Sequence, residues 1–226
     1  MADFTVSLRI AEEGEIQAER KDALRYMGYG HSQPDEAVSS LIDACEKELT
    51  ASIRGRACYA LVPVSFPQRF TVDLGFGIIE SVSLSKHLQG CHSAFLFAAT
   101  LGIGPDRLIG KYGRLSPSKA AITDALASSA IESWCDTVEL EITRNKGPHC
   151  ARFSPGYGDF PLEAQEKLTS CLNTAKLLGI ALSSSLLMTP TKSVTAVIGI
   201  GASARTCGNK CMFCNKKNCI YREVLV

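Results

Sequence analysis

The order of the apolar patterns constrains the fold of this chain most, because its strands come in pairs rather than alternating singly with helices. Runs rich in β-branched and aromatic residues at 58–66 and 70–79 predict two strands joined by a Pro67-Gln68 turn. Further strands are expected at 94–100, around 181–188 and at 193–200. Strict alternation would favour a parallel sheet, whereas this order favours an α+β fold with an antiparallel sheet.

Helical patterns occupy much of the rest of the chain. The clearest covers 34–54, where apolar residues recur at helical spacing between Pro34 and Gly55. The longest covers 117–144, after Ser116 as N-cap and Pro117 as first residue, and its many Ala and Ser residues permit close packing. Shorter helices are predicted at 15–27, 84–88 and 161–172. The Gly102 and Gly104-Pro105 stretch is expected to break the structure after strand 94–100.

Composition predicts one compact domain over 1–204 and a short Cys-rich tail over 205–226. Apolar residues make up 46% of the 226 residues and charged residues 21%, enough for a substantial core. The net charge of +1 and the absence of a long basic run argue against nucleic acid as a partner. No apolar run approaches the ~20 residues that span a bilayer, and the N-terminus lacks a signal-peptide layout. We therefore expect a cytoplasmic protein without a membrane partner.

The segment Arg152-Phe-Ser-Pro-Gly-Tyr-Gly-Asp-Phe-Pro161 is the strongest candidate for a ligand site. Its Pro-Gly and Gly residues predict a tight loop in which backbone groups approach a ligand closely. Arg152 supplies a planar cation for a carboxylate or phosphate, and Tyr157 supplies an aromatic face and a hydroxyl. Asp159 ahead of Pro161 predicts the start of the following helix. On spacing alone, a surface turn with an incidental arginine explains the segment equally well.

The pattern Arg152-x-x-x-Gly156-Tyr157 resembles the S-adenosylmethionine-binding loop in the reactivation domain of cobalamin-dependent methionine synthase, particularly its shorter free-standing relatives. The stretches Leu24-Arg-Tyr-Met-Gly-Tyr29, Ala98-Ala-Thr-Leu-Gly102 and Thr191-Lys-Ser-Val-Thr-Ala-Val-Ile-Gly199 fit the same family, so the resemblance covers about residues 20–205. It implies a twisted antiparallel sheet with helices packed around it. Methionine synthase itself is much larger, and a chain of 226 residues has no room for its substrate and cobalamin modules.

The resemblance also implies a binding site made of Glu132, Arg152, Ser154, Gly156 and Tyr157. Arg152 would hold the ligand's carboxylate and Glu132 its amino group, although a mid-helix glutamate by itself indicates only a solvated helix face. The implied role is the reductive methylation of cob(II)alamin on a separate methionine synthase or other corrinoid protein. An electron donor of the flavodoxin or ferredoxin type is implied as well. The cofactors carry that chemistry, and no catalytic acid or base is assigned.

The ten cysteines fall into two groups. Six stand singly in apolar or helical contexts and are expected to be small buried side chains, namely Cys45, Cys58, Cys91, Cys135, Cys150 and Cys171. The tail carries the other four in the pattern C-x3-C-x2-C-x4-C, which predicts a metal site at Cys207, Cys211, Cys214 and Cys219. A 4Fe-4S cluster and zinc both remain open, and the irregular gaps favour the cluster. A radical S-adenosylmethionine enzyme is excluded, because only seven residues follow Cys219.

Two functions follow from these patterns. The first is a reactivation protein that binds S-adenosylmethionine and supports the repair of a corrinoid partner. The second is a non-enzymatic iron-sulfur or zinc-binding module that serves regulation or electron transfer. The intact 152–157 loop favours the first. The four histidines are scattered without metal-ligand spacing and are assigned no role.

Overall fold

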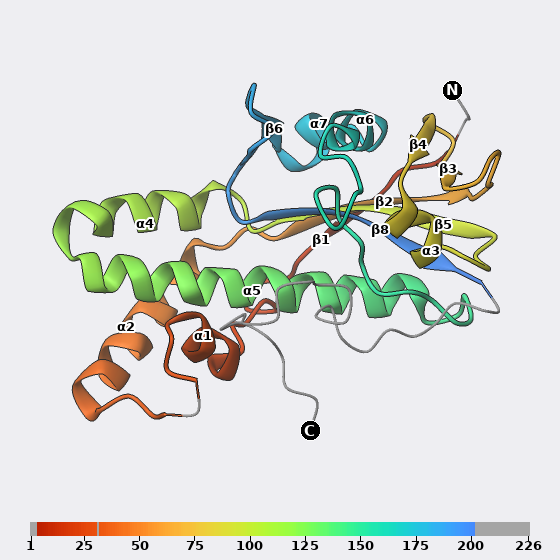
Figure 1. The fold of residues 1–226 in the computed structure, drawn as a ribbon. Coiled ribbons are helices and arrows are strands. Elements are labelled where there is room, and N and C mark those ends of the chain that lie inside the picture. The colour runs from red at the N-terminus through yellow and green to blue at the C-terminus, as the bar shows by residue number, and fades with distance from the viewer. Residues whose placement is uncertain (1–3, 31, 202–226) are drawn as a thin grey trace.

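A four-stranded antiparallel sheet forms the centre of the molecule in the computed structural model, which describes residues 4–30 and 32–201 (Figure 1). Its strands, in spatial order, are β1 (Ser7–Ile10), β2 (Arg56–Pro63), β5 (Ser93–Thr100) and β8 (Ser193–Ile200). The central pairs are long, since β5 pairs over its full length with β2 on one side and β8 on the other. The predicted antiparallel α+β architecture is confirmed.

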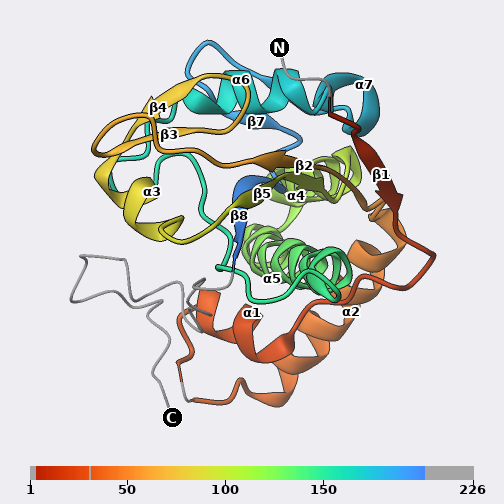
Figure 2. The same cartoon turned by 90° about the vertical axis from the view of Figure 1, so that its right-hand side faces the viewer.

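Helices and small hairpins cover both faces of this sheet (Figure 2). One face carries α1 (Arg20–Tyr26), α2 (Glu36–Ser52) and α5 (Pro117–Thr143), and α4 (Ile103–Leu115) packs on α5 and α2. The other face carries α3 (Val82–His87), α6 (Ala164–Cys171) and α7 (Thr174–Leu178). Two hairpins complete the described chain, β3 (Thr71–Asp73) with β4 (Ile78–Glu80) and β6 (Ala181–Leu182) with β7 (Met188–Thr189).

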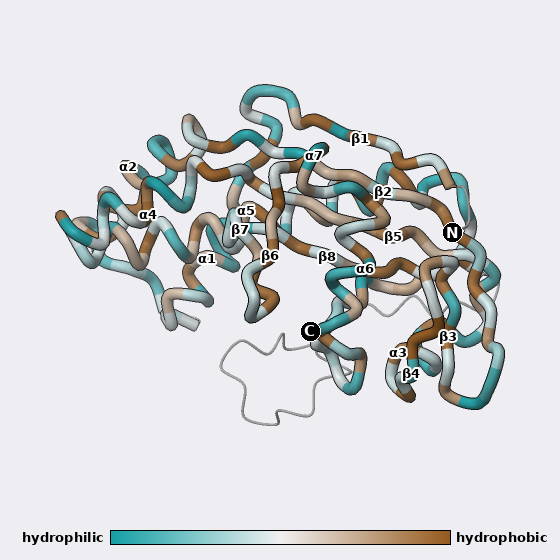
Figure 3. Tube along the Cα trace, turned by 90° about the horizontal axis from the view of Figure 1, so that it is seen from above, coloured by the Kyte–Doolittle hydropathy of each residue, from teal (hydrophilic) through white to brown (hydrophobic). Residues whose placement is uncertain are grey.

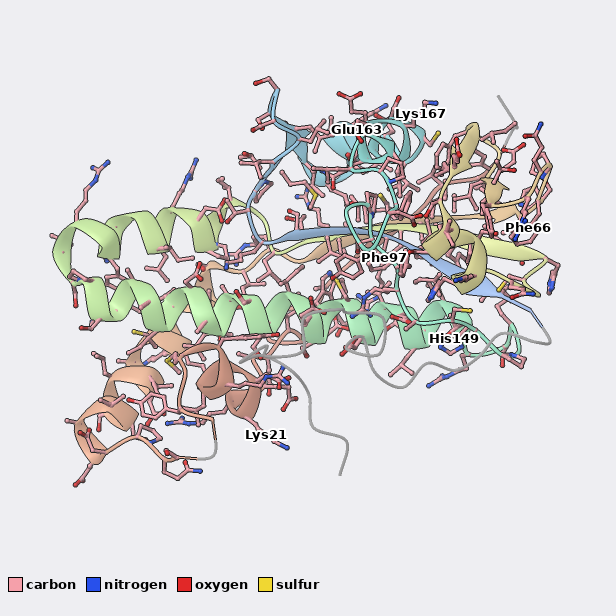
Figure 4. The ribbon with its side chains drawn as sticks, in the orientation of Figure 1. Lys21, Phe66, Phe97, His149, Glu163 and Lys167 are labelled. Carbon is pink, nitrogen blue, oxygen red and sulfur yellow. The ribbon has the colours of Figure 1, made fainter. Side chains whose placement is uncertain are left out.

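The central strands are buried on both faces, so the core has two layers. Phe97 lies between the sheet and α5 (Figure 4), whereas its neighbour Leu96 belongs to the opposite layer with α3, α6 and α7. Successive strand residues point to opposite faces, which explains why β5 is apolar almost throughout rather than alternating. Its hydrophobic character is visible in the tube of Figure 3.

Helix α5 lies along one face of the sheet and forms the base of the candidate site. It begins at Pro117 directly after Ser116, as the sequence predicts. Small side chains such as Ala127 and Ala130 are fully buried, which lets the helix approach its neighbours closely. Trp134 is also buried and donates its indole N–H to the carbonyl oxygen of Arg56, at 3.3 Å. These contacts hold α5 in a fixed position relative to β2.

Several sequence predictions were wrong in detail. The expected break at Gly102 and Gly104 is the start of α4, which runs from Ile103 to Leu115. Gly104 is needed there because an added Cβ would overlap the carbonyl group of Ser52 at the end of α2. Pro105 fits because a proline in the first helical turn removes an N–H that has no partner in the helix.

The other corrections concern element boundaries. The strand expected over 70–79 is the hairpin β3–β4, because Gly75 and Gly77 take positive φ values of 79° and 136° and turn the chain. The strand expected at 181–188 is a hairpin with only two residues in each arm. The helix expected at 15–27 begins at Arg20, and the one expected at 161–172 begins at Ala164. Strand β1 and helix α7 had no clear signal in the sequence.

Candidate functional site

Residues 149–153 lie along the free side of β8 and extend the sheet there. Cys150 donates its N–H to the carbonyl oxygen of Gly199 at 2.8 Å. Phe153 and Val197 exchange two backbone hydrogen bonds, each 2.9 Å long. This pairing fixes the backbone on both sides of Arg152, so the position of its side chain is determined by the sheet rather than by a loose loop.

Residues 154–160 form a tight turn, as predicted. Gly156 has a φ of 91° and donates its N–H to the carbonyl oxygen of Phe160 at 2.8 Å. Gly158 has a φ of 57°, and a Cβ at this position would come within 2.5 Å of the Ser83 hydroxyl oxygen. Both positions therefore require glycine, one for its conformation and the other also for its close contact with α3.

Asp159 caps a different helix from the one the sequence indicates. Its carboxylate accepts hydrogen bonds from the hydroxyl of Ser81 at 2.7 Å and from the backbone N–H groups of Val82 and Ser83, both at 2.8 Å. These groups form the N-terminus of α3, whereas α6 begins later, at Ala164. The hydrogen bond from Ser81, with those from the two backbone groups, holds the pKa of Asp159 well below its usual range. The prediction that Asp159 starts the following helix was wrong.

Arg152 is buried against α5 and meets three carboxylates there. Its guanidinium donates to Glu139, to Asp136 at 2.5 Å and to Glu132 at 3.2 Å. Positions 132, 136 and 139 lie on one face of a helix, because they are four and three residues apart. The structure thus brings together the two residues proposed as anchors, and it pairs them with each other.

The three carboxylates differ in exposure, which divides them into an inner and an outer set. The side chain of Glu139 is 13% exposed, while those of Glu132 and Asp136 are 36% and 62% exposed. Burial raises the pKa of Glu139, and the charge of Arg152 opposes that rise. His149 approaches Glu139 at 4.0 Å and lies near the end of α5 in Figure 4. With Glu139 held inside, Glu132 and Asp136 are the carboxylates able to turn toward a ligand.

A stack of aromatic rings supports the turn on the opposite side of the sheet. His87 stacks on Phe153 with ring centroids 4.6 Å apart, and its Nε2 lies 2.8 Å from the carbonyl oxygen of Ala151. Burial lowers the pKa of His87. Tyr157 meets Phe153 edge-on at 5.8 Å and remains 48% exposed, so one of its faces is open to a ligand. Ser154 is half-buried at the start of the turn, where its carbonyl oxygen accepts from Tyr157 N–H at 3.0 Å.

A groove of about 900 Å³ opens beside α5, one helical turn before Glu132. Its walls include Tyr26 at the end of α1, and Met27 and Tyr29 from the segment that follows, with Ser128 from α5. Burial, together with the nearby carboxylate of Glu132, raises the pKa of Tyr26. The 24–29 stretch and the 152–157 loop, which are far apart in the sequence, therefore both approach Glu132.

Sequence reasoning missed His87, Asp136 and Glu139. The carboxylates at 136 and 139 carry the pattern of a solvated helix face, and only the fold reveals the buried arginine beside them. His87 is 64 residues from its partner Ala151, so no local spacing indicates the contact. The signal in the sequence that could have indicated Asp136 and Glu139 is their spacing of four and seven positions from Glu132, which puts the three carboxylates on one helix face.

The cysteines of the described domain are largely as predicted. Cys45, Cys58, Cys91, Cys135 and Cys150 are buried reduced thiols, and Cys171 is half-buried. Within 4–30 and 32–201, no group of three or more His, Cys, Asp or Glu side chains is arranged to hold a metal ion. The predicted metal ligands Cys207, Cys211, Cys214 and Cys219 lie outside the described residues.

No protein-family model matches this chain, and no curated protein matches it by sequence. Among solved structures it is similar to the crystal structure of the MetH reactivation domain bound to AdoHcy, with a TM-score of 0.65 and 15% identity. The match covers 88% of this chain and 79% of that chain. The likeness confirms the expected fold, an antiparallel sheet with helices packed around it. No helix in the part of the chain that the structure describes is long and apolar enough to cross a membrane.

Proposed function

We propose that this chain binds S-adenosylmethionine and supports the reductive methylation of cob(II)alamin on a separate cobalamin-dependent methionine synthase or related corrinoid protein. The observation that carries the proposal is the meeting of Arg152 with Glu132 beside the 154–160 turn. Arg152 offers a cation to the ligand's carboxylate, and Glu132 offers a carboxylate to its ammonium group. The fold shared with a reactivation domain bound to AdoHcy supports the same ligand class.

Arg152 already forms ion pairs with carboxylates of α5, so the ligand must replace some of these pairs when it binds. Glu139 is the most buried carboxylate and stays on Arg152 Nη1, which keeps the guanidinium in its present orientation. Asp136 contacts Nη2 from the solvent side, so the ligand's carboxylate replaces it there at small cost. Glu132 then turns from Arg152 to the ligand's ammonium. The excess of carboxylates over cations also favours the positive sulfonium.

The exposed face of Tyr157 and the groove beside Tyr26 are the two surfaces available for the adenosyl group. Tyr26 lies near Glu132, and Tyr157 belongs to the turn that follows Arg152 in the chain. Both surfaces offer aromatic rings on which a flat base can stack. Tyr157 is the better candidate, since its loop already carries Arg152 and its ring is fixed by Phe153.

The corrinoid is a substrate carried by the partner protein, and the chemistry belongs to it and to the sulfonium. One electron, from a donor of the flavodoxin or ferredoxin type, reduces cob(II)alamin to cob(I)alamin. The methyl group then leaves the sulfonium for cobalt, and S-adenosylhomocysteine is released. This chain binds and orients the ligand so that the methyl carbon lies within roughly 3–3.5 Å of the attacking atom. No side chain has to move a proton in that step.

Calorimetric titration with S-adenosylmethionine tests the proposal. Glu132→Gln keeps the shape of the side chain and removes its charge, so we expect at least roughly tenfold weaker binding. Glu166→Gln is the matched control, because Glu166 is exposed on α6 across the sheet from α5. Equal loss in both variants, or no loss in either, would contradict the assignment of Glu132.

The spacing of the tail cysteines favours a second role, which is to deliver electrons through a 4Fe-4S cluster. We expect the double variant Cys211→Ser/Cys214→Ser to lose the visible absorption of a cluster and the electron-driven methylation of a corrinoid protein. Its affinity for S-adenosylmethionine should remain, because Arg152 and Glu132 lie in the domain. Stoichiometric zinc without iron in anaerobic preparations would show a structural metal site instead.

A further inference from the structure

Two buried cysteines from distant parts of the chain meet beside β8. Cys91 lies in the turn between α3 and β5, and Cys150 lies in the segment that pairs with β8. Their Sγ atoms are 3.8 Å apart, although the residues are separated by 59 positions in the sequence. The exposed fractions are 6% for Cys91 and 2% for Cys150. Neither thiol has a role in the proposed binding of S-adenosylmethionine.

The sheet does not bring these two thiols together by ordinary strand pairing. Gly199 of β8 pairs with Ala94 on one side and accepts a hydrogen bond from Cys150 on the other. Chain segments on either side of one strand are normally about 10 Å apart. The thiols meet because Gly199 has no side chain, since a Cβ there would come within 2.7 Å of the Cys91 sulfur. The contact therefore depends on a glycine that the backbone conformation itself does not demand.

Hydrogen bonds around the two thiols affect how readily Cys91 ionises. Cys150 has one S–H, which can be donated to the carbonyl oxygen of His87, at 3.2 Å, or to the sulfur of Cys91, at 3.8 Å. The hydrogen bond with Cys150 lowers the pKa of Cys91. By contrast, burial raises the pKa of the solitary Cys58 thiol to about 12. Cys91 is thus the more exposed thiol of the pair, and its contact with Cys150 favours its thiolate.

We propose that Cys91 and Cys150 form a redox-active dithiol that a peroxide oxidises to an intramolecular disulfide. The thiolate of Cys91 attacks hydrogen peroxide, the O–O bond breaks, and Cys91 becomes a sulfenic acid as one water is released. The sulfur of Cys150 then attacks the Cys91 sulfur and the S–O bond breaks, which releases a second water. Two electrons pass from the thiols to the peroxide, and an S–S bond replaces two S–H bonds.

The disulfide fastens the segment before Arg152 to the turn before β5. It closes a chain loop across 59 positions, which removes conformational freedom from the unfolded state. We therefore expect the oxidised domain to unfold at a temperature at least about 5 °C higher than the reduced domain. The inference is independent of the proposed ligand, because its readouts need no S-adenosylmethionine.

Peptide mapping of the full chain tests the proposal. Reduced protein is exposed to hydrogen peroxide, free thiols are alkylated, and disulfide-linked peptides are identified by mass spectrometry. We expect a linked peptide joining Cys91 to Cys150 with a mass 2 Da below the sum of its reduced halves, and the cross-link should disappear on reduction. Recovery of both cysteines as alkylated thiols, or as separate sulfinic acids, would overturn the proposal.

Two variants sharpen this test. Cys58→Ser removes a buried thiol outside the pair and should leave both the cross-link and the thermal shift intact. Gly199→Ala places a methyl group against the sulfur of Cys91 and against Leu88, which displaces Cys91, so disulfide formation should slow at least tenfold while both cysteines remain. Unchanged kinetics in a folded Gly199→Ala protein would also overturn the proposal. The wild-type peptide map decides the question if that variant fails to fold.

Discussion

The substitution Arg152→Met removes the cation that compensates the buried carboxylate of Glu139. Methionine keeps an apolar stem of similar length in the space beside α5, so packing loss is small. The charge of Glu139 is then stranded at a position that is 13% exposed. We expect the variant to fold but to be measurably less stable than the wild type.

The size of the stability loss in Arg152→Met is the sum of what each carboxylate partner of Arg152 contributes. Breaking a buried ion pair by removing one member costs about 3–5 kcal/mol. Glu139 keeps some contact with solvent and with His149, which lowers that figure. Glu132 and Asp136 are exposed enough to be solvated without the arginine, so each adds at most about 1 kcal/mol. The expected loss is about 2–4 kcal/mol in the free energy of unfolding at pH 8.

Urea unfolding monitored by tryptophan emission measures this loss. Trp134 is the single tryptophan of the chain, and it is buried in the domain, so unfolding shifts its emission. If the free energy of unfolding depends on urea concentration with the same slope in the variant and the wild type, the difference between them reports stability and not a change in the denatured state. The double variant Arg152→Met/Glu139→Gln should recover about 1–3 kcal/mol, because it removes the stranded charge.

The loss must also depend on pH with a definite sign. Burial already raises the pKa of Glu139, and removing Arg152 raises it further. A carboxyl group whose pKa is raised in the folded state destabilises the fold least when it is protonated. The free energy of unfolding then falls as the pH rises from the unfolded-state pKa to the folded-state pKa. The difference between variant and wild type should therefore be smaller at pH 5 than at pH 8. An equal difference at both pH values, with no recovery in the double variant, would refute the reasoning.

Three further predictions concern other parts of the domain. Gly104→Ala should destabilise the fold by about 1–3 kcal/mol in urea unfolding because its Cβ overlaps Ser52, whereas Gly110→Ala in the same helix has open space and should stabilise it by up to about 1 kcal/mol. Asp159→Ala should cost about 1 kcal/mol near pH 7, and the cost should vanish at acidic pH, because a lowered pKa stabilises the fold only while the carboxyl is ionised. Asp136→Asn should tighten the binding of S-adenosylmethionine roughly two- to fivefold in calorimetry, because Asp136 competes with the ligand for Arg152. A stabilising Gly104→Ala, a destabilising Gly110→Ala, an acid-insensitive Asp159 or weaker binding in Asp136→Asn would each contradict the contact concerned.

Local signals in the sequence predicted the elements that local physics determines. Helix α5 was expected at 117–144 and spans Pro117–Thr143, because a serine and a proline mark its start and its interior has no breaker. Helix α4 was missed because a Gly-Pro pair normally ends a helix. Here the pair occupies the first turn, and a contact with Ser52 in another helix explains the glycine. No property of residues 102–105 taken alone reveals that contact.

The candidate site shows the same division. The turn at 154–160 follows from its own glycines, and the sequence predicted it. The three-carboxylate environment of Arg152 and the capping of α3 by Asp159 join residues between 13 and 78 positions apart. Such contacts depend on how α5 and the 149–160 segment pack, which composition and periodicity do not specify. That Arg152 and Glu132 belong to one ligand site was expected only from the family resemblance, and their roles in binding stay predictions.

Titration of the reduced full chain with S-adenosylmethionine tests the central claim most directly, with Arg152→Lys as the matched variant. Lysine keeps the positive charge near Glu139, but it lacks the planar guanidinium that holds Glu139 on Nη1 while Nη2 binds the ligand's carboxylate. We predict saturable binding at one site per chain, weakened at least tenfold in Arg152→Lys while the unfolding temperature changes little. Absence of saturable binding in the wild type, or equal affinity in the two proteins, would contradict the account.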